Sequence, residues 1–196
     1  MNSFLKSLFR LFMTLLAAPL IVIYWLLRPV SRADQLFAGF SQLLSLVPGL
    51  SGSYLRVAFY RFTMGACSRD LYIGFGTLFS QQPTELGSGC YIGPQCNIGL
   101  CTIEKNCLLG SGVHILSGRN QHRFDGSDTP IRLQGGVFTR VTVGENSWIG
   151  NGAIVMANIG SRCVVGAGAV VTRDVPPGSV VVGNPARVVD AGGEPR

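Results

Sequence analysis

The chain has 196 residues, a formal net charge of +6 and a mean hydropathy of +0.35, a high value for a soluble enzyme. Its basic residues form no cluster interleaved with aromatic residues, and only two of them are lysines, which argues against a nucleic-acid partner. Four of the six cysteines, Cys90, Cys96, Cys101 and Cys107, are spaced 6, 5 and 6 apart, which matches no CxxC zinc pattern. This spacing argues against a metal site. No A-x-A-like cleavage site follows the first apolar run, so export is not indicated and we expect reduced thiols in a cytoplasmic compartment.

The N-terminal part is the most apolar region. Residues 4–27 form a nearly continuous apolar stretch that contains Lys6 and Arg10 close to its start. Its uncharged part, 11–27, would be about 25 Å long as a helix, which is marginal for a hydrocarbon core of about 30 Å. A second apolar segment, 36–50, is too short to span a membrane alone. The pattern predicts two N-terminal hydrophobic helices.

Basic residues flank the first apolar stretch on both sides. Lys6 and Arg10 lie near its start, and Arg28 and Arg32 follow it, so the charge bias that would orient a membrane span is nearly balanced. Three arrangements remain open: a span, helices lying in the interface of one leaflet, or helices packed on the rest of the protein. The flanking charges favour interfacial helices with arginines at headgroup level.

From residue 86 onward, aliphatic residues recur about every six positions, each commonly followed by glycine. Three six-residue sides make one triangular coil whose aliphatic side chains point inward and stack on those of the next coil. A small residue, often cysteine, comes four positions after the aliphatic and is expected to face inward near a corner. Glycine is expected to let the backbone take the tight corners. The aliphatic positions are Leu86, Ile92, Ile98, Ile103, Leu109, Ile115, Val143, Ile149, Val155, Ile159, Val165 and Val171.

The repeat is interrupted once, between Ile115 and Val143, by a polar and turn-rich segment. Long loops in compact domains are usually functional or disordered, so we expect a loop that protrudes from the prism. The predicted fold is mainly β, a left-handed parallel β-helix (hexapeptide solenoid) preceded by two N-terminal hydrophobic helices. The predicted parts are membrane-associated helices at 1–52, a connecting segment at 53–72, the β-helix at 73–190 with its loop at 119–140, and a tail at 191–196.

The end of the chain carries the most specific pattern, TVGENSWIGNGAIV followed by VVGAGAVVTRDVPPGSVVVGNPARVV. Together with a histidine in the loop before the last coils, it resembles the hexapeptide-repeat acyltransferases, most closely their sugar and polysaccharide O-acetyltransferase branches. The resemblance covers roughly residues 70–190. It implies acetyl-CoA as co-substrate and a homotrimer with active sites between neighbouring prisms.

The resemblance also implies a catalytic histidine supplied by the loop, which is His122 in this chain. A neutral imidazole there would take the proton from an acceptor hydroxyl as its oxygen attacks the thioester carbonyl. The alternatives are that His122 is a solvated loop residue or that His114 is the base. Asp125 or Asp128 is a candidate to orient His122, and Asn97 and Asp125 are the expected acceptor-side residues.

Five further residues match the positions where the family binds CoA. Asn151 and Ala167 would contact the pantetheine arm, because small residues let it approach the main chain. Thr172, Arg173 and Arg187 would meet the CoA phosphates, since guanidinium groups bind phosphate oxygens well. A solvated C-terminal face is the alternative for the two arginines.

These implications give a functional expectation. Because acetyl-CoA is cytoplasmic, the prism is expected on the cytoplasmic face of the inner membrane. The expected activity is O-acetylation of a saccharide, lipid-linked or membrane-proximal, in bacterial surface polysaccharide or lipopolysaccharide assembly. The alternatives are a small acceptor, such as serine or an amino sugar, and a non-catalytic scaffold. A γ-carbonic-anhydrase-like zinc enzyme is disfavoured, because it needs three histidine ligands and the chain has two histidines.

Overall fold

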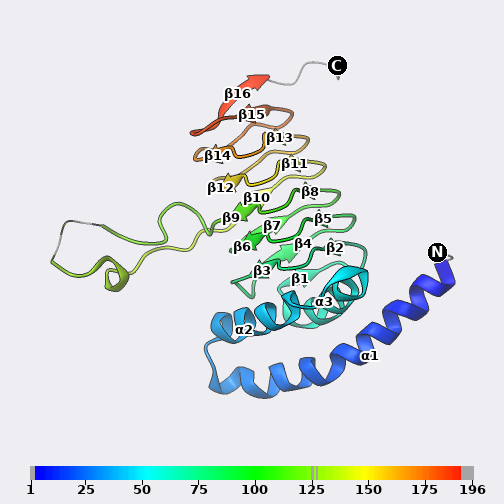
Figure 1. Ribbon diagram of the computed structural model, residues 1–196. Helices are drawn as coiled ribbons and strands as arrows, with labels where there is room; N and C mark the ends of the chain where they lie inside the picture. Colours follow the sequence, from blue (N-terminus) through cyan, green and yellow to red (C-terminus); the bar gives the residue numbers. More distant parts are fainter. Residues whose placement is uncertain (1–2, 125, 127, 191–196) are drawn as a thin grey trace.

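The structure, a computed structural model, describes residues 3–124, 126 and 128–190. Helices lie at one end of a tall stack of short strands, and a long loop leaves the stack near its middle (Figure 1). The helices are α1 (Ser3–Leu27), α2 (Ala33–Ser45) and α3 (Gly49–Thr63), with short 3-10 helices η1 (Arg28–Val30) and η2 (Ile131–Leu133).

The strands form three parallel sheets, the sides of a prism that the chain visits in turn. Sheet A contains β1 (Ala66–Cys67), β4 (Glu85–Leu86), β7 (Cys101–Ile103) and β10 (Val141–Val143). Sheet B contains β2 (Tyr72–Ile73), β5 (Tyr91–Ile92), β8 (Leu108–Leu109), β11 (Trp148–Ile149), β13 (Val164–Val165), β15 (Val180–Val182) and the antiparallel β16 (Arg187–Asp190). Sheet C contains β3 (Leu78–Phe79), β6 (Asn97–Ile98), β9 (His114–Ile115), β12 (Ile154–Val155) and β14 (Val170–Val171). The predicted hexapeptide β-helix is confirmed.

The prism interior is built from the predicted aliphatic positions. Matching positions in successive coils pair in register, as Leu86 does with Ile103 and Ile92 with Leu109, and all of them are buried. The predicted inward cysteines Cys90, Cys96, Cys107 and Cys163 are buried too. Cys101, which falls outside the six-residue register, also points inward where a corner is shortened. Burial raises the pKa of the Cys101 thiol to about 12, so this thiol behaves as a small apolar residue.

Glycine serves two separate purposes at the corners. Gly150, directly after an aliphatic residue, lies against the next coil, where an added Cβ would be 2.5 Å from the Ala167 backbone nitrogen. Gly112 lies later in its corner, has φ +66° and faces open space. The glycine beside the aliphatic residue therefore permits close approach of coils, and the left-handed backbone conformation belongs to the residue just before the inward small residue.

The helical part differs from the prediction. There are three helices where two were expected, and α3 runs across the predicted boundary at residue 52 into the expected connecting segment. The first coil begins at Ala66, earlier than the predicted residue 73. The hydrophobic pattern missed α3 because its buried face includes the polar residues Ser53, Arg56 and Tyr60.

These polar residues join the helices to the prism. The fully buried guanidinium of Arg56 donates to the Leu44 and Val47 carbonyls, at 3.0 and 2.7 Å, and twice to the Ile73 carbonyl, at 3.2 and 2.9 Å. It thus satisfies the Val47 carbonyl just after α2 and is a second donor to the Leu44 carbonyl, which also accepts the Val47 amide at 3.3 Å. Ser53 Oγ accepts a hydrogen bond from the Ile73 amide at 3.0 Å. Burial lowers the pKa of Arg56, and no carboxylate neutralises it among the described residues.

Candidate functional site

The outer face of sheet C brings together two residues that the sequence considered separately. Asn97 on β6 is directly opposite His114 on β9, and Ile154 on β12 follows in the same row. Both polar side chains are exposed and line a cavity of about 220 Å³, together with Ser117 and Gln121. The predicted acceptor residue Asn97 therefore lies beside His114, the alternative base.

The protruding loop connects β9 to β10 and forms two paired arms close to the prism. The Thr139 amide donates to the Ser117 carbonyl at 2.9 Å, Val137 to Asn120 at 2.8 Å, and Arg123 to Gly135 at 2.9 Å. The arms carry the loop well away from the prism body (Figure 1).

His122 is exposed on the first of these arms and does not line the Asn97–His114 cavity, although its neighbour Gln121 does. Asp125, the second predicted acceptor residue, lies outside the described residues. Asp128 is exposed in the outer part of the loop. Within one chain, the histidine predicted as the base is thus held at the edge of the cavity, not inside it.

Two of the predicted CoA residues lie at the corner between sheets B and C. Asn151 Oδ1 accepts a hydrogen bond from the Ser111 amide at 3.1 Å, and the Asn151 carbonyl accepts one from the Gly168 amide at 2.8 Å. Ala167 is exposed one coil further along. Successive coils lie close together at this corner, because a Cβ on Gly110 would overlap the Asn151 side chain of the next coil. It leaves main chain and small side chains open to a slender ligand.

Two more lie at the opposite corner, between sheets C and A, where the loop leaves the prism. Arg119 Nη1 donates to the Thr172 carbonyl at 3.0 Å and ties the loop to this corner. A cavity of about 340 Å³ here is lined by Arg119, Arg140, Arg173 and Asp174 among others. Arg140 is ion-paired with Glu85 at 3.5 Å, whereas Arg173 is exposed and makes no ion pair within the described part of the chain.

The sequence did not single out Arg119, although its place as the first basic residue of the loop was a usable signal. Arg187, on β16 at the end of the prism, is exposed, and its Nη1 donates to the neighbouring Ala186 carbonyl at 3.0 Å. The guanidinium groups of Arg119, Arg173 and Arg187 therefore lie toward the C-terminal half of the prism, where they could bind an extended polyanion.

Sheet C separates the two corners. The structure brings Asn97 close to His114, Asn151 close to Ala167, and Thr172 close to Arg173, but it does not gather these pairs in one cavity of a single chain. A ligand as long as CoA that touches both kinds of corner must cross sheet C or lie between two prisms.

Comparisons with known proteins agree with this architecture. The family model described as the hexapeptide repeat of succinyl-transferase matches residues 140–173. A candidate acetyltransferase of Dictyostelium discoideum is 31% identical over 159 residues, which are 79% of this chain and 68% of that protein. Other curated relatives align over 33% to 57% of their own lengths, so the chain matches only part of them.

Two solved structures share the fold. A maltose O-acetyltransferase from Clostridium difficile superposes with a TM-score of 0.71 at 22% identity, covering 84% of this chain and 90% of that one. A hexapeptide-repeat acetyltransferase from Vibrio cholerae, in complex with acetyl coenzyme A, superposes with a TM-score of 0.63 at 20% identity, covering 83% and 88%. With the coils, the corners and these relatives taken together, the chain belongs to the hexapeptide-repeat acetyltransferase family.

Proposed function

We propose that the protein transfers the acetyl group of acetyl-CoA to a hydroxyl group of a saccharide. The observation that carries this proposal is the Asn97–His114 cavity on sheet C, flanked on one side by a corner of small residues and on the other by a corner rich in arginine. Family membership supports acetyl transfer, and the neighbours named for maltose acetylation and for bound acetyl coenzyme A support the acceptor class and the donor.

The residues of the two corners fit the donor. The pantetheine arm is slender and would lie against the exposed residues Asn151 and Ala167, beside Gly152 and Gly168, where an added Cβ would meet no atom within 4 Å. The CoA phosphates would be met by Thr172, Arg173 and Arg187, because the two guanidinium groups are exposed, make no ion pair among the described residues, and can donate to phosphate oxygens.

In the proposed reaction, the neutral imidazole of His122 accepts the proton of the acceptor hydroxyl as that oxygen attacks the thioester carbonyl. The tetrahedral intermediate collapses by breaking the carbon–sulfur bond, and the departing thiolate takes the proton back from the imidazolium. The products are the O-acetyl ester and free CoA, so the histidine ends in its starting state. The acceptor would be held by hydrogen bonds to the side-chain oxygen of Asn97 and to the ring nitrogens of His114.

A second copy of the chain would complete this site, in the expected homotrimer. The loop holds His122 outside the Asn97–His114 cavity of its own prism and exposes Phe124, Val137 and Phe138, of which Phe124 is 83% accessible. The outer face of sheet B also has an apolar row that a neighbour could cover, whereas the outer face of sheet A has Glu85, Thr102 and Thr142. The sheet B row consists of Tyr72, Tyr91, Leu108, Trp148, Val164 and Val180.

The acceptor is proposed to be lipid-linked or close to a membrane, in the assembly of a bacterial surface polysaccharide or lipopolysaccharide. Helix α1 supports this, because it is apolar and long enough to associate with a bilayer. A soluble acceptor such as serine gives no reason for such a helix. The protein would act at the cytoplasmic face of the inner membrane, where its donor is found.

The test is release of free CoA thiol from acetyl-CoA by detergent-solubilised protein, with a panel of free and lipid-linked saccharides as acceptors. We expect release that depends on a saccharide and is fastest with a lipid-linked one. Binding of acetyl-CoA without release on any saccharide, serine or amino sugar would overturn the proposed activity. Failure to bind acetyl-CoA would favour a non-catalytic scaffold.

A further inference from the structure

We propose that α1 lies in the plane of an anionic membrane leaflet instead of crossing the bilayer, with the prism standing on the helices. The surface that would meet the lipid is the exposed face of α1, and the basic residues beside it are Lys6, Arg28, Arg32, Arg61 and Arg69. This inference rests on the membrane attachment in the proposed function and specifies its geometry and its lipid partner.

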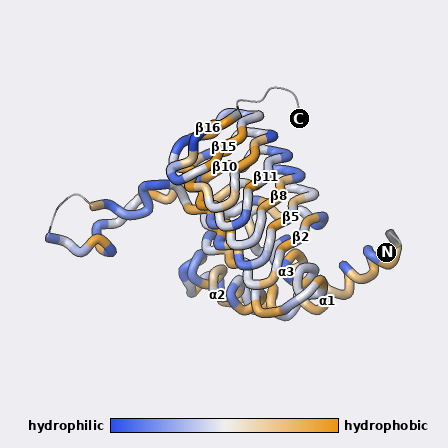
Figure 2. The backbone as a smooth tube through the Cα atoms, turned by 45° about the horizontal axis from the view of Figure 1, so that its top comes forward, coloured by the Kyte–Doolittle hydropathy of each residue, from blue (hydrophilic) through white to orange (hydrophobic). Residues whose placement is uncertain are grey.

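Helix α1 has one covered face and one open face. Met13, Ala17 and Tyr24 are buried, a spacing of three to four residues per turn that places them on one side of the helix. Within Phe4–Val30, the most apolar stretch of 18 residues has a mean hydropathy of 2.0, and 17% of that stretch is buried. Figure 2 shows this helix as the longest apolar segment, lying at the end of the prism. The exposed apolar residues of α1 are Phe4, Leu5, Leu8, Leu11, Phe12, Leu15, Leu16, Val22, Ile23, Trp25, Leu26 and Leu27.

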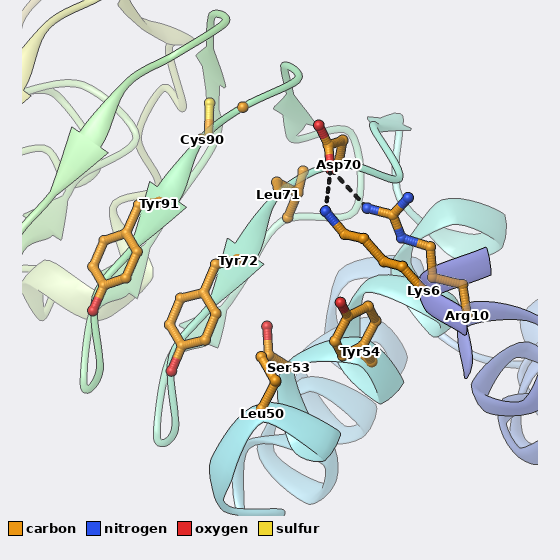
Figure 3. A pocket seen from close by; sticks show the side chains of 11 residues that line it. Lys6, Arg10, Leu50, Ser53, Tyr54, Asp70, Leu71, Tyr72, Cys90 and Tyr91 are labelled. Carbon is orange, nitrogen blue, oxygen red and sulfur yellow. Dashed lines mark hydrogen bonds and ion pairs between the residues drawn. The ribbon is translucent and has the colours of Figure 1, made fainter. Parts of the chain in front are cut away.

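The structure ties α1 to the rest of the protein near both of its ends. Close to the N-terminus, Arg10 Nη2 and Lys6 Nζ lie 2.7 and 3.4 Å from Asp70 Oδ1, at the edge of a cavity of about 360 Å³ between α1, α3 and the first coils (Figure 3). Near its C-terminus, Trp25 Nε1 donates to the Phe62 carbonyl at 3.1 Å. Between these ties, α1 packs along α3.

These ties are incompatible with a transbilayer α1. A helix that crossed the membrane would carry α3 and the start of the first coil into the hydrocarbon beside it, including the exposed side chains of Arg61, Arg69 and Asp70. Charged side chains facing lipid at that depth are strongly unfavourable. With α1 in the membrane plane, its open face enters the leaflet while these charged groups stay at headgroup level.

The charge of this region identifies the lipid. Residues 1–72 contain seven of the 16 lysines and arginines but only two of the ten acidic residues. One of these acids, Asp34, accepts a hydrogen bond from the Gln82 amide at 2.9 Å, and the other is Asp70. Basic residues beside an interfacial helix attract anionic headgroups. A second copy of the chain, the other possible cover for an apolar face, would bring Lys6, Arg28 and Arg32 near their like-charged counterparts.

This orientation places the candidate site close to the membrane. Sheet C begins at the helical end of the prism, and β6, which carries Asn97, is its second strand from that end (Figure 1). A saccharide attached to a lipid in the same leaflet would need to rise past only the first coils to reach Asn97. The inference thus favours lipid-linked acceptors over long, detached polysaccharides.

The test is flotation of the full-length protein with vesicles of phosphatidylcholine alone or phosphatidylcholine mixed with phosphatidylglycerol. We expect binding about tenfold stronger to the anionic vesicles, weakened by salt. Leu15→Gln, at a residue 65% exposed on α1, should reduce binding, whereas the matched control Leu133→Gln, at a loop residue 64% exposed, should not. Equal binding of the two variants, or binding without lipid preference, would overturn the inference.

Topology is tested with a protease-cleavable tag at the N-terminus of vesicle-bound protein. An in-plane α1 leaves the tag on the same side as the prism, so added protease removes it, while a span protects the tag and contradicts the inference. No flotation, together with self-association that Leu15→Gln abolishes, would identify a second copy as the partner. Thiol release measured in detergent on the same preparation separates the two proposals, because it does not depend on membrane binding.

Discussion

The helical end and the prism are stabilised by contacts of different kinds. In the prism, each inward aliphatic residue packs on its counterpart in the next coil, so the same contact recurs along the stack. At the helical end, single polar side chains make contacts that occur once: Arg56 to three carbonyls, and Ser41 Oγ to both the Tyr60 hydroxyl and the Phe79 amide. The packing contact of one prism residue therefore recurs at its neighbours, whereas no other described residue makes the hydrogen bonds of Arg56.

The largest expected effect on stability comes from Arg56→Met. The methionine keeps much of the volume but leaves the Val47 and Ile73 carbonyls without their buried donors, and it removes one of the two donors to the Leu44 carbonyl. Each unsatisfied carbonyl is costly, so we expect a loss of about 3–5 kcal/mol in the free energy of unfolding, measured by urea denaturation. The control is Arg61→Met on the exposed side of the same helix, expected to change stability by less than about 0.5 kcal/mol. Equal effects of the two variants would contradict the role given to Arg56.

A smaller loss is expected when two coils are forced apart. In Gly150→Ala, the new Cβ meets the Ala167 nitrogen, and the backbone of the next coil must shift. We expect a loss of about 1–3 kcal/mol, read from the urea midpoint. Gly112→Ala is the matched control, since it meets no atom within 4 Å and only its φ of +66° is strained, at a cost of about 1 kcal/mol. A larger loss in the control would mean that corner conformation, not coil spacing, limits the prism.

The same contrast explains what the sequence could predict. The prism was predictable because its contacts recur at a constant spacing, and the inward position of four of the six cysteines followed from that spacing. Helix α3 was not, because burial of Arg56 depends on carbonyls from α2 and β2 that are distant in sequence. At the candidate site, the loop position of His122 was predictable. The cavity that Asn97 and His114 share with Gln121 was not, because it depends on how the loop leaves sheet C.

The smallest expected effect concerns the exposed tie at the start of α1. The Arg10 guanidinium, and then the Lys6 ammonium, lower the pKa of Asp70. Because the pKa is lowered in the folded state, this stabilisation is present above the ordinary value of 3.8 and is lost as the pH falls through the lower folded value. We expect proteolysis near Lys6 to increase only at such acidic pH, and Asp70→Asn to cost less than about 1 kcal/mol and remove the acid dependence. Unchanged acid dependence in Asp70→Asn would contradict this assignment.

The most direct test of the proposed chemistry compares the two histidines in the thiol-release assay. For His122→Ala we expect kcat to fall by about 10²–10⁴-fold, the contribution typical of a general base, with little change in the KM for acetyl-CoA. For His114→Ala, proposed to hold the acceptor beside Asn97, we expect mainly a higher KM for the saccharide. If His122→Ala keeps the wild-type kcat while His114→Ala loses it, the base is on sheet C and the proposed role of the loop is contradicted.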